Sequence, residues 1–232
     1  MKKILLLIVL LLMALAGYFY FNQQPKSCHY AERTQPIQFL IVHSFDESLN
    51  EMIERLDELE ISTHYLIDQK GKIIQLVADD KVAWHAGKSY WKGITGLNAY
   101  SIGIKLESPS AGQNPFPEVQ IQSFKKLAQK LMQKYNIPPE NVLGHSDIAP
   151  TRKVDPGKMF PWKELGLGPK DIEQGDMREK LTIIGYDTTN LKAAILAYNR
   201  HFHPELVPTD YDIEHLEENL AEMIQDENPV QP

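Results

Sequence analysis

A short, fully apolar run is the feature that most narrows what this chain can fold into. Phe39-Leu40-Ile41-Val42 is followed directly by His43, and such a run predicts a strand that is buried on both faces. The next apolar residues, from Leu49 to Leu59, recur at helical spacing among acidic residues and predict an amphipathic helix. A buried strand followed by a helix is typical of α/β folds, in which functional residues often stand at the carboxyl ends of strands, as His43 does.

Further segments continue this alternation of strands and helices. In chain order they are a strand pair at Thr63–Ile67 and Lys72–Val77 with a turn between them, a strand at Ser101–Glu107, and helices through Phe124–Met132 and Lys163–Leu165. The strand at 101–107 alternates strictly, so Lys105 and Glu107 are expected on one face and the larger apolar residues on the other. Together these elements predict an α/β domain that spans roughly residues 30–168.

The composition excludes several kinds of protein. The chain has 232 residues and a single cysteine, so it can form neither an internal disulfide scaffold nor a cysteine-based zinc ribbon. Its formal net charge is −7 and it has no long basic run, which argues against electrostatic binding of nucleic acid. The length suits one globular domain of ordinary size together with a smaller part.

Residues 1–24 form a segment of their own. Two lysines precede an uncharged apolar run from Ile4 to Phe21. The run is long enough for a membrane anchor, and residues 14–16 (Ala-Leu-Ala) also offer a site of the kind at which signal peptides are cleaved. We favour the anchor, because cleavage would leave an apolar new N-terminus. Both interpretations place the rest of the chain outside the cytoplasm, in the cell envelope.

Two stretches separate the α/β domain from the segments on either side of it. Residues 25–36 are polar and are predicted to be a linker, and Gly166, Gly168 and Pro169 mark a second one. Residues 177–226 then predict a small three-helix module. Its helices are expected at Met177–Ile184, Leu191–Phe202 and Ile213–Ile224.

Three residues stand out as candidate metal ligands by their positions. His43 ends a buried strand, His145 follows a glycine in a loop, and Asp155 precedes Pro-Gly. Zinc binds neutral imidazole and carboxylate, and catalytic zinc sites use three protein ligands and leave a fourth position open. None of the eight histidines has a self-contained ligand spacing, so position alone leaves open that these are ordinary loop histidines.

Six motifs, taken in order, resemble a known family. They are Val42-His43-Ser44, Ser62–Ile67 (STHYLI), Ala83–Gly87 (AWHAG), Asn98–Ile104 (NAYSIGI), Gly144–Pro150 (GHSDIAP) and Arg152–Gly157 (RKVDPG). This pattern resembles the zinc-dependent N-acetylmuramoyl-L-alanine amidases of the type-2 amidase family, which share their fold with peptidoglycan recognition proteins. The resemblance covers residues 37–168 and implies a mixed central sheet flanked by helices. The segment after it resembles the small helical peptidoglycan-binding-like module of the periplasmic branch.

The resemblance also implies roles for individual residues. His43, His145 and Asp155 are implied as the ligands of Zn²⁺, and Lys153 as a cation that stabilises an oxyanion near the metal. A Lys153 that is merely ion-paired is the alternative. The expected substrate-binding residues are His64, His85, Asn98 and Arg152, with His64 and His85 lying either in the groove or beside the metal ligands. His64 has an almost equally good interpretation as a buried strand histidine. We expect His201 and His203 to be solvated residues at a helix end.

One position departs from the family pattern. Lys105 stands where the family has a glutamate that acts as general base, and a lysine there also adds positive charge beside the metal. Glu107, two residues further along the same face, is the nearest candidate to replace that base. Alternatively, the metal and Lys153 support slow hydrolysis, or the domain binds peptidoglycan without cutting it.

The sequence therefore predicts hydrolysis of the amide bond between N-acetylmuramic acid and L-alanine in peptidoglycan or muropeptides. The main alternative is a non-catalytic, zinc-containing peptidoglycan-binding protein. A helical interaction module that carries an inactive domain is a third, which would leave the metal ligands unexplained. The expected partners are peptidoglycan or muropeptides and, through residues 1–24, a membrane.

Overall fold

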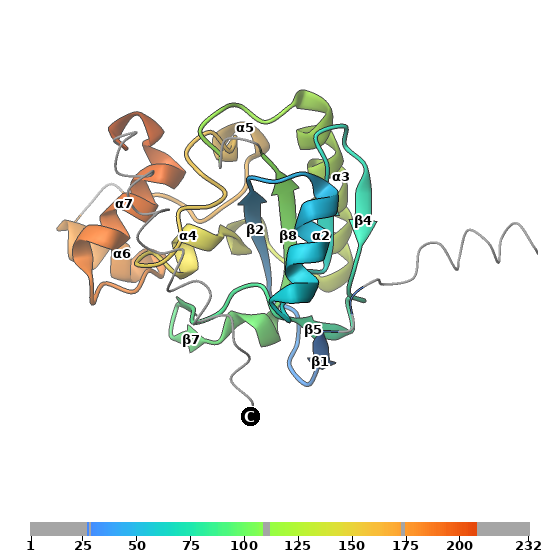
Figure 1. Ribbon diagram of the computed structural model, residues 1–232. Helices are drawn as coiled ribbons and strands as arrows, with labels where there is room; N and C mark the ends of the chain where they lie inside the picture. Colours follow the sequence, from blue (N-terminus) through green and yellow to red (C-terminus); the bar gives the residue numbers. More distant parts are fainter. Residues whose placement is uncertain (1–26, 28, 109–111, 173–174, 208–232) are drawn as a thin grey trace, which may run out of the picture.

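Strands β2 and β8 lie side by side at the centre of a five-stranded sheet in the computed structural model, which describes residues 27, 29–108, 112–172 and 175–207 (Figure 1). The strand order is β4-β3-β8-β2-β9, and all neighbours are parallel except β3 and β4. The strands are β2 (Phe39–Phe45), β3 (Tyr65–Ile67), β4 (Ile73–Gln75), β8 (Ser101–Glu107) and β9 (Val142–Gly144). The expected mixed α/β sheet is confirmed.

Short strands and helices complete the described part of the chain. Two small antiparallel pairs are β1 (Tyr30–Glu32) with β5 (Lys81–Ala83), and β6 (Tyr90–Trp91) with β7 (Ile94–Thr95). The α-helices are α2 (Leu49–Glu58), α3 (Glu118–Tyr135), α4 (His145–Ile148), α5 (Trp162–Leu165), α6 (Met177–Ile184) and α7 (Leu191–Phe202). The 3₁₀ helices are η1 (Leu97–Tyr100), η2 (Pro139–Asn141) and η3 (Pro204–Leu206).

One face of the sheet is closed by α3 and α5. The apolar residues of β8 point to this face, where Ile102, Ile104 and Leu106 pack with Phe124 of α3 and Trp162 of α5. The alternation in the sequence of β8 thus predicted the two faces of this strand correctly. In Figure 1 this layer lies behind the sheet, whereas α2 crosses in front of it.

The other face is covered by two separate groups of elements. Met52 and Leu56 of α2 pack on Leu66 and Phe45, toward the β3 side of the sheet. On the β9 side, α4, α6 and α7 share a core with the residues that β2 and β9 present to this face. The middle of the face, between the two groups, is occupied by the polar side chains of the candidate site.

The C-terminal helices do not form a core of their own. Leu181 and Ile184 of α6 and Tyr198 of α7 pack in one cluster with Ile41 and Leu143 of the central sheet. The helices predicted at 177–184 and 191–202 are confirmed, and both complete the core of the α/β domain. The third helix, expected at Ile213–Ile224, lies outside the described residues.

Of the two predictions for the N-terminal part of the chain, one lies outside the described residues and the other can be compared with the structure. The anchor or signal segment, residues 1–24, lies outside the described residues, and no described helix is long and apolar enough to cross a membrane. The segment predicted as a linker contains β1, which pairs along its length with β5. Arg33 continues this attachment, since its guanidinium donates to the backbone oxygens of Lys81, Ala99 and Ser101.

Candidate metal centre

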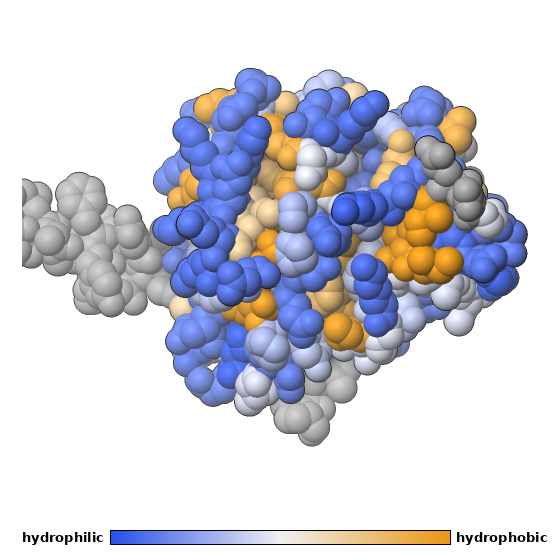
Figure 2. All heavy atoms as spheres, turned by 180° about the vertical axis from the view of Figure 1, so that it is seen from behind, coloured by the Kyte–Doolittle hydropathy of each residue, from blue (hydrophilic) through white to orange (hydrophobic). Residues whose placement is uncertain are grey.

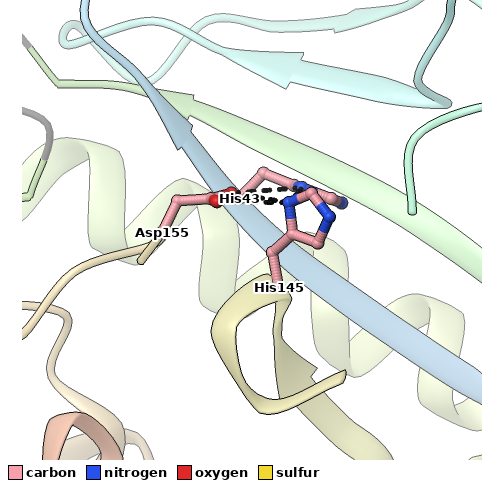
Figure 3. Close-up of side chains that lie close together, drawn as sticks. All are labelled: His43, His145 and Asp155. Atoms are coloured by element: carbon pink, nitrogen blue, oxygen red, sulfur yellow. Dashed lines mark hydrogen bonds and ion pairs between the residues drawn. The ribbon is translucent and has the colours of Figure 1, made fainter. Parts of the chain in front are cut away.

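Three predicted ligands come together on the polar middle of the sheet. His43 Nδ1 lies 3.0 Å from His145 Nδ1, and Asp155 Oδ2 lies 3.2 Å from each of these two nitrogens. Figure 3 shows the carboxylate pointing at both rings, with His43 projecting from β2 and His145 from the start of α4. The sheet causes this meeting, because Val42 is paired with Gly144 and each is followed by its histidine. Asp155 is held by the hydrogen bond from Ser146 N to its carbonyl oxygen, 2.8 Å.

A chain of hydrogen bonds decides which nitrogen of His43 carries the proton. The Ser101 hydroxyl donates to the carbonyl of Leu97 at 2.6 Å, so its oxygen accepts from His85 Nε2, 3.3 Å away. His85 Nδ1 is then an acceptor, and it lies 3.0 Å from His43 Nε2, which must be the donor. This assignment, made from the hydrogen-bond network, leaves the Nδ1 lone pair of His43 directed at Asp155.

His145 is arranged in the same way by a different partner. Its Nε2 lies 3.2 Å from the carbonyl oxygen of Ala86, which can only accept, so Nε2 carries the proton and Nδ1 has a free lone pair. Burial lowers the pKa of His145, and it lowers the pKa of His43 well below its ordinary value, since a proton on His43 would also be repelled by one on His145. Both rings are therefore neutral at neutral pH.

The three residues thus present acceptor atoms to one another with no proton between them. Three such atoms within 3.2 Å repel each other unless a cation lies among them. In a tetrahedral zinc site with bonds of about 2.0–2.1 Å, neighbouring ligand atoms stand about 3.3 Å apart. The observed spacing, the neutral rings and the carboxylate therefore fit a bound metal ion.

His85 requires a glycine beneath its ring. Gly103, in the middle of β8, has no Cβ, and a Cβ built there would lie 2.5 Å from His85 Cγ. Of the two positions expected for His85, in the groove or beside the metal ligands, these contacts favour the second, because its ring nitrogens are engaged between His43 and Ser101. The sequence did not identify Ser101 or Leu97 as part of the site, because neither the residue types nor their spacing indicate a role in orienting a histidine.

Lys105 and Glu107 both lie on the site face of β8 but reach different places. Lys105 is paired in register with His43, so its half-buried side chain shares the sheet face with the metal triad, and its charge contributes to lowering the pKa of His43. Glu107 is paired with Phe45, one alternation further on, and its Oε2 accepts from the backbone N of Gln69, 3.1 Å away. The carboxylate of Glu107 is thus engaged by the turn between β3 and β4.

Two of the four predicted substrate-binding residues brace the segment that follows β5. Asn98 Oδ1 accepts from the backbone N of His85 and of Ala86, at 3.0 and 2.7 Å. The Arg152 guanidinium donates to the carbonyl oxygens of Ala86 and Lys88, at 3.2 and 2.5 Å. Both residues therefore hold the backbone that carries His85 and the acceptor of His145.

Lys153 and His64 are both buried, Lys153 where its charge acts on His145 and His64 beside the ring of His85. Lys153 is 5% exposed, and its positive charge, like that of Arg152, acts to lower the pKa of His145. His64 is fully buried, accepts from Gly103 N at 3.0 Å, and burial lowers its pKa to about 3. This burial favours the interpretation of His64 as a buried strand histidine over a role in contacting substrate.

A second histidine–carboxylate cluster lies beside the triad, and sequence reasoning missed it. Asp147, two residues after His145, is 1% exposed and accepts from Tyr186 OH at 2.7 Å, Gly144 N at 2.7 Å and His201 Nδ1 at 3.0 Å. The prediction that His201 is a solvated helix-end residue is wrong. Its ring is 8% exposed and stacks on Trp162 at 4.1 Å, because α7 packs against α4 and α5.

Comparisons with known proteins agree with this geometry. A family model described as N-acetylmuramoyl-L-alanine amidase matches residues 33–158. The N-acetylmuramoyl-L-alanine amidase AmiD of Escherichia coli is 34% identical over 218 residues, which cover 77% of this chain and 79% of that protein. The 1,6-anhydro-N-acetylmuramyl-L-alanine amidase AmpD of Enterobacter cloacae is 36% identical over 129 residues, 56% of this chain and 68% of AmpD.

Two solved structures are similar over most of the described chain. One is E. coli AmiD in complex with the substrate anhydro-N-acetylmuramic acid-L-Ala-D-gamma-Glu-L-Lys, with a TM-score of 0.67, 30% identity, and coverage of 86% of this chain and 100% of that one. The other is AmpDh3 of Pseudomonas aeruginosa in complex with anhydromuramic pentapeptide, with a TM-score of 0.64, 27% identity, and coverage of 88% and 97%.

Proposed function

This chain belongs to the N-acetylmuramoyl-L-alanine amidase family, and from that membership we propose that it hydrolyses the amide bond between N-acetylmuramic acid and L-alanine in peptidoglycan or muropeptides. The observation that carries the proposal is the set of three converging acceptors on His43, His145 and Asp155. The anhydromuropeptides held by the two similar structures support muropeptides as the substrate class.

We assign Zn²⁺ to the triad, because two imidazoles and one carboxylate with an open fourth position are the ligand set of catalytic zinc. A bound Zn²⁺ supplies a water of lowered pKa and polarises the carbonyl to be attacked. The chain's part is to orient the ligands. His85 fixes the ring of His43 through Nε2, and the Ala86 carbonyl fixes the ring of His145.

Lys153 supplies the positive charge for the developing oxyanion. It is buried beside His145, and a preorganised cation in a site with little water stabilises negative charge more strongly than one in solvent. The lowering of the pKa of His145 by this charge supports the role. If Lys153 served only as a structural cation, Lys153→Arg would leave the rate of hydrolysis unchanged.

Lys105 supports a second candidate function, a zinc-containing protein that binds peptidoglycan without cutting it. An ammonium group has no lone pair and cannot take a proton from water or pass one to the leaving amine. Lys105 holds this group in register with His43, where the family resemblance places a glutamate. Glu107 would have to leave the backbone N of Gln69 to act as the base instead.

Mass spectrometry of a purified muropeptide after incubation with the zinc-loaded protein separates the two functions. We expect Lys105→Glu to raise the rate of amide hydrolysis by about 10²-fold, the lower range for a positioned general base. Lys105→Gln is the matched control, because it removes the charge without adding a base and should raise the rate much less. Glu107→Gln abolishes hydrolysis by the natural sequence only if Glu107 is the substitute base. If zinc stays bound and Lys105→Glu hydrolyses nothing, the binding protein is the better assignment.

We further propose that the protein acts in the cell envelope, on the extracytoplasmic side of a membrane that holds residues 1–24. The uncharged run from Ile4 to Phe21 and the lysines before it support this location. A reporter that is active only in the cytoplasm, fused at the C-terminus, should be silent.

A further inference from the structure

A hollow lies on the face of the sheet opposite to the metal triad. It has a volume of about 930 Å³ and lies between β4 and α3. Four lysines line it: Lys72, Lys126, Lys130 and Lys134. The last three recur every four residues and so follow one stripe of α3. Figure 2 shows the face that α3 covers, where hydrophilic side chains form a column near the left edge of the view.

This basic character is local to α3. The helix contains four lysines and, after Glu118, no acidic residue, although the whole chain has a net charge of −7. Lys134 pairs with Asp79 at 2.9 Å. Within the described parts of the chain, the side chains of Lys72, Lys126 and Lys130 make no ion pair or hydrogen bond. Asp79 and Asp80 also line the hollow, so four lysines face two carboxylates and the lining keeps a net positive charge.

The chain enters the fold at the rim of this hollow. The backbone N of Ser27 donates to the carbonyl oxygen of Leu76 at 3.0 Å, and Leu76 directly follows β4. The sequence predicts a membrane anchor that ends at Phe21, which lies outside the described residues. Five residues, 22–26, separate the two points, and the six extended steps from residue 21 to residue 27 span at most about 22 Å. An anchored protein therefore holds Ser27 close to the membrane surface.

Two oppositely charged surfaces adjoin this entry point. One is the C-terminal part of α2, where Asp57 lies 3.0 Å from His29 and the neighbouring Glu54, Glu58 and Glu60 carry further negative charge. The other is the lysine-lined hollow. A surface of anionic lipid headgroups repels the first and attracts the second, and the attraction grows with each lysine that reaches the surface.

We propose that the hollow is a docking surface for the anionic lipid headgroups of the membrane that holds the N-terminal segment. The tether brings this edge of the sheet to the bilayer, and the lysines select the α3 side over the α2 side. Because the triad lies on the opposite face of the sheet from α3, this orientation turns the metal centre toward the space beyond the membrane. The inference depends on the predicted anchor and is independent of the hydrolytic activity.

The test uses the full chain in lipid vesicles with a fluorescent probe on a single cysteine in a Cys28→Ser background. Gln133→Cys places the probe on α3, and Asn50→Cys is the matched control on α2, since both replace exposed neutral amides. Lipids with a nitroxide on the headgroup should quench the α3 probe at least about twofold more than the α2 probe when the vesicles contain phosphatidylglycerol. Phosphatidylcholine alone, or about 1 M salt, where charges are screened within about 3 Å, should abolish the difference.

A charge-reversal variant tests whether the lysines of the hollow cause the docking. Exchange of the three lysines that make no ion pair within the described residues, Lys72, Lys126 and Lys130, for glutamate should remove the difference in quenching and leave the hydrolysis of a free muropeptide unchanged. The control exchanges three exposed lysines elsewhere, Lys92, Lys163 and Lys170, and should keep the difference. Equal quenching of both probes in the natural sequence overturns the proposal, and so does failure of the full chain to associate with vesicles. Lost binding to peptidoglycan sacculi with unchanged quenching would assign the hollow to glycan strands instead.

Discussion

Two buried clusters of histidine and carboxylate flank the short helix α4, and they differ in their protons rather than in their composition. His145, the first residue of α4, faces His43 and Asp155, and all three offer lone pairs to the same point. Asp147, two residues later, faces Tyr186 OH, Gly144 N and His201 Nδ1, all of which donate to it. The first cluster lacks positive charge at its centre, whereas the carboxylate of the second has three donors and needs no ion.

The difference teaches what distinguishes a metal centre from a structural network. A buried carboxylate that receives three hydrogen bonds contributes to stability. Its loss leaves three buried donors without an acceptor. A set of two neutral imidazoles with fixed tautomers and one carboxylate contributes little or costs stability until a cation is bound, after which binding adds to the stability of the native state. The two clusters should therefore respond in opposite ways to substitution and to metal.

The largest effect is expected from breaking the metal triad. His145→Ala should reduce bound zinc from about one ion per chain to background and abolish the rise in melting temperature on adding zinc. The free energy of unfolding of the metal-free protein should change far less, because one of three repelling acceptors has been removed. Metal analysis together with thermal melts with and without a chelator measures both quantities. A variant that keeps its zinc would contradict the assignment of the triad.

The next largest effect is expected from Asp147→Asn. The NH₂ group of the new asparagine would face groups that themselves donate hydrogen bonds. The free energy of unfolding of the metal-free protein should therefore fall by about 3 kcal/mol, as is typical when a buried charged hydrogen-bonding partner is removed. Chemical denaturation in the presence of a chelator measures this loss. Tyr186→Phe is the control, since it removes one donor and should cost about 1 kcal/mol. The comparison fails if Asp147→Asn destabilises the protein only when zinc is present.

A smaller effect should follow from disturbing the hydrogen bonds that orient the triad. His85→Ala removes the acceptor of His43 Nε2–H and should weaken zinc binding about 10–100-fold, as is common for partners of metal ligands. Ser101→Ala keeps His85 in place and should weaken binding less. Competition with a chelating dye measures the affinity, and the absorption spectrum of the Co²⁺-loaded protein reports whether the coordination geometry has changed. Unchanged affinity in both variants would show that His43 is oriented by other contacts.

The smallest effect concerns His64, a buried histidine that belongs to neither cluster. Its pKa is about 3 in the folded protein and near 6.5 when exposed, so the unfolded state takes up its proton first as the pH falls. The stability due to a neutral His64 is complete above pH 6.5 and is lost as the pH falls toward 3. Between pH 7 and pH 6 the loss from this residue is about 0.7 kcal/mol. Denaturation of the natural sequence and of His64→Gln at the two pH values should show a steeper fall for the natural sequence.

Much of the fold could be predicted because its signals are local. The alternation at Ser101–Glu107 predicted both the strand and its two faces, and the apolar run at 39–42 predicted the central strand. The triad was predicted from the order of six motifs, each of which is itself a short stretch of sequence. Such patterns can be recognised in the sequence because hydrophobic periodicity and turn formation depend on residues that are near neighbours in the chain.

The sequence by itself therefore determined the mixed α/β class, the strands that carry the site and the identity of the three converging residues. Only the tertiary structure decided where the protons lie, since His43 and His85 are 42 positions apart and Asp147 and His201 are 54. It also decided that His201 is buried and that α6 and α7 complete the core, because a helix face is buried only by what packs on it. Contacts between distant residues depend on the packing of whole elements, and no local pattern records them.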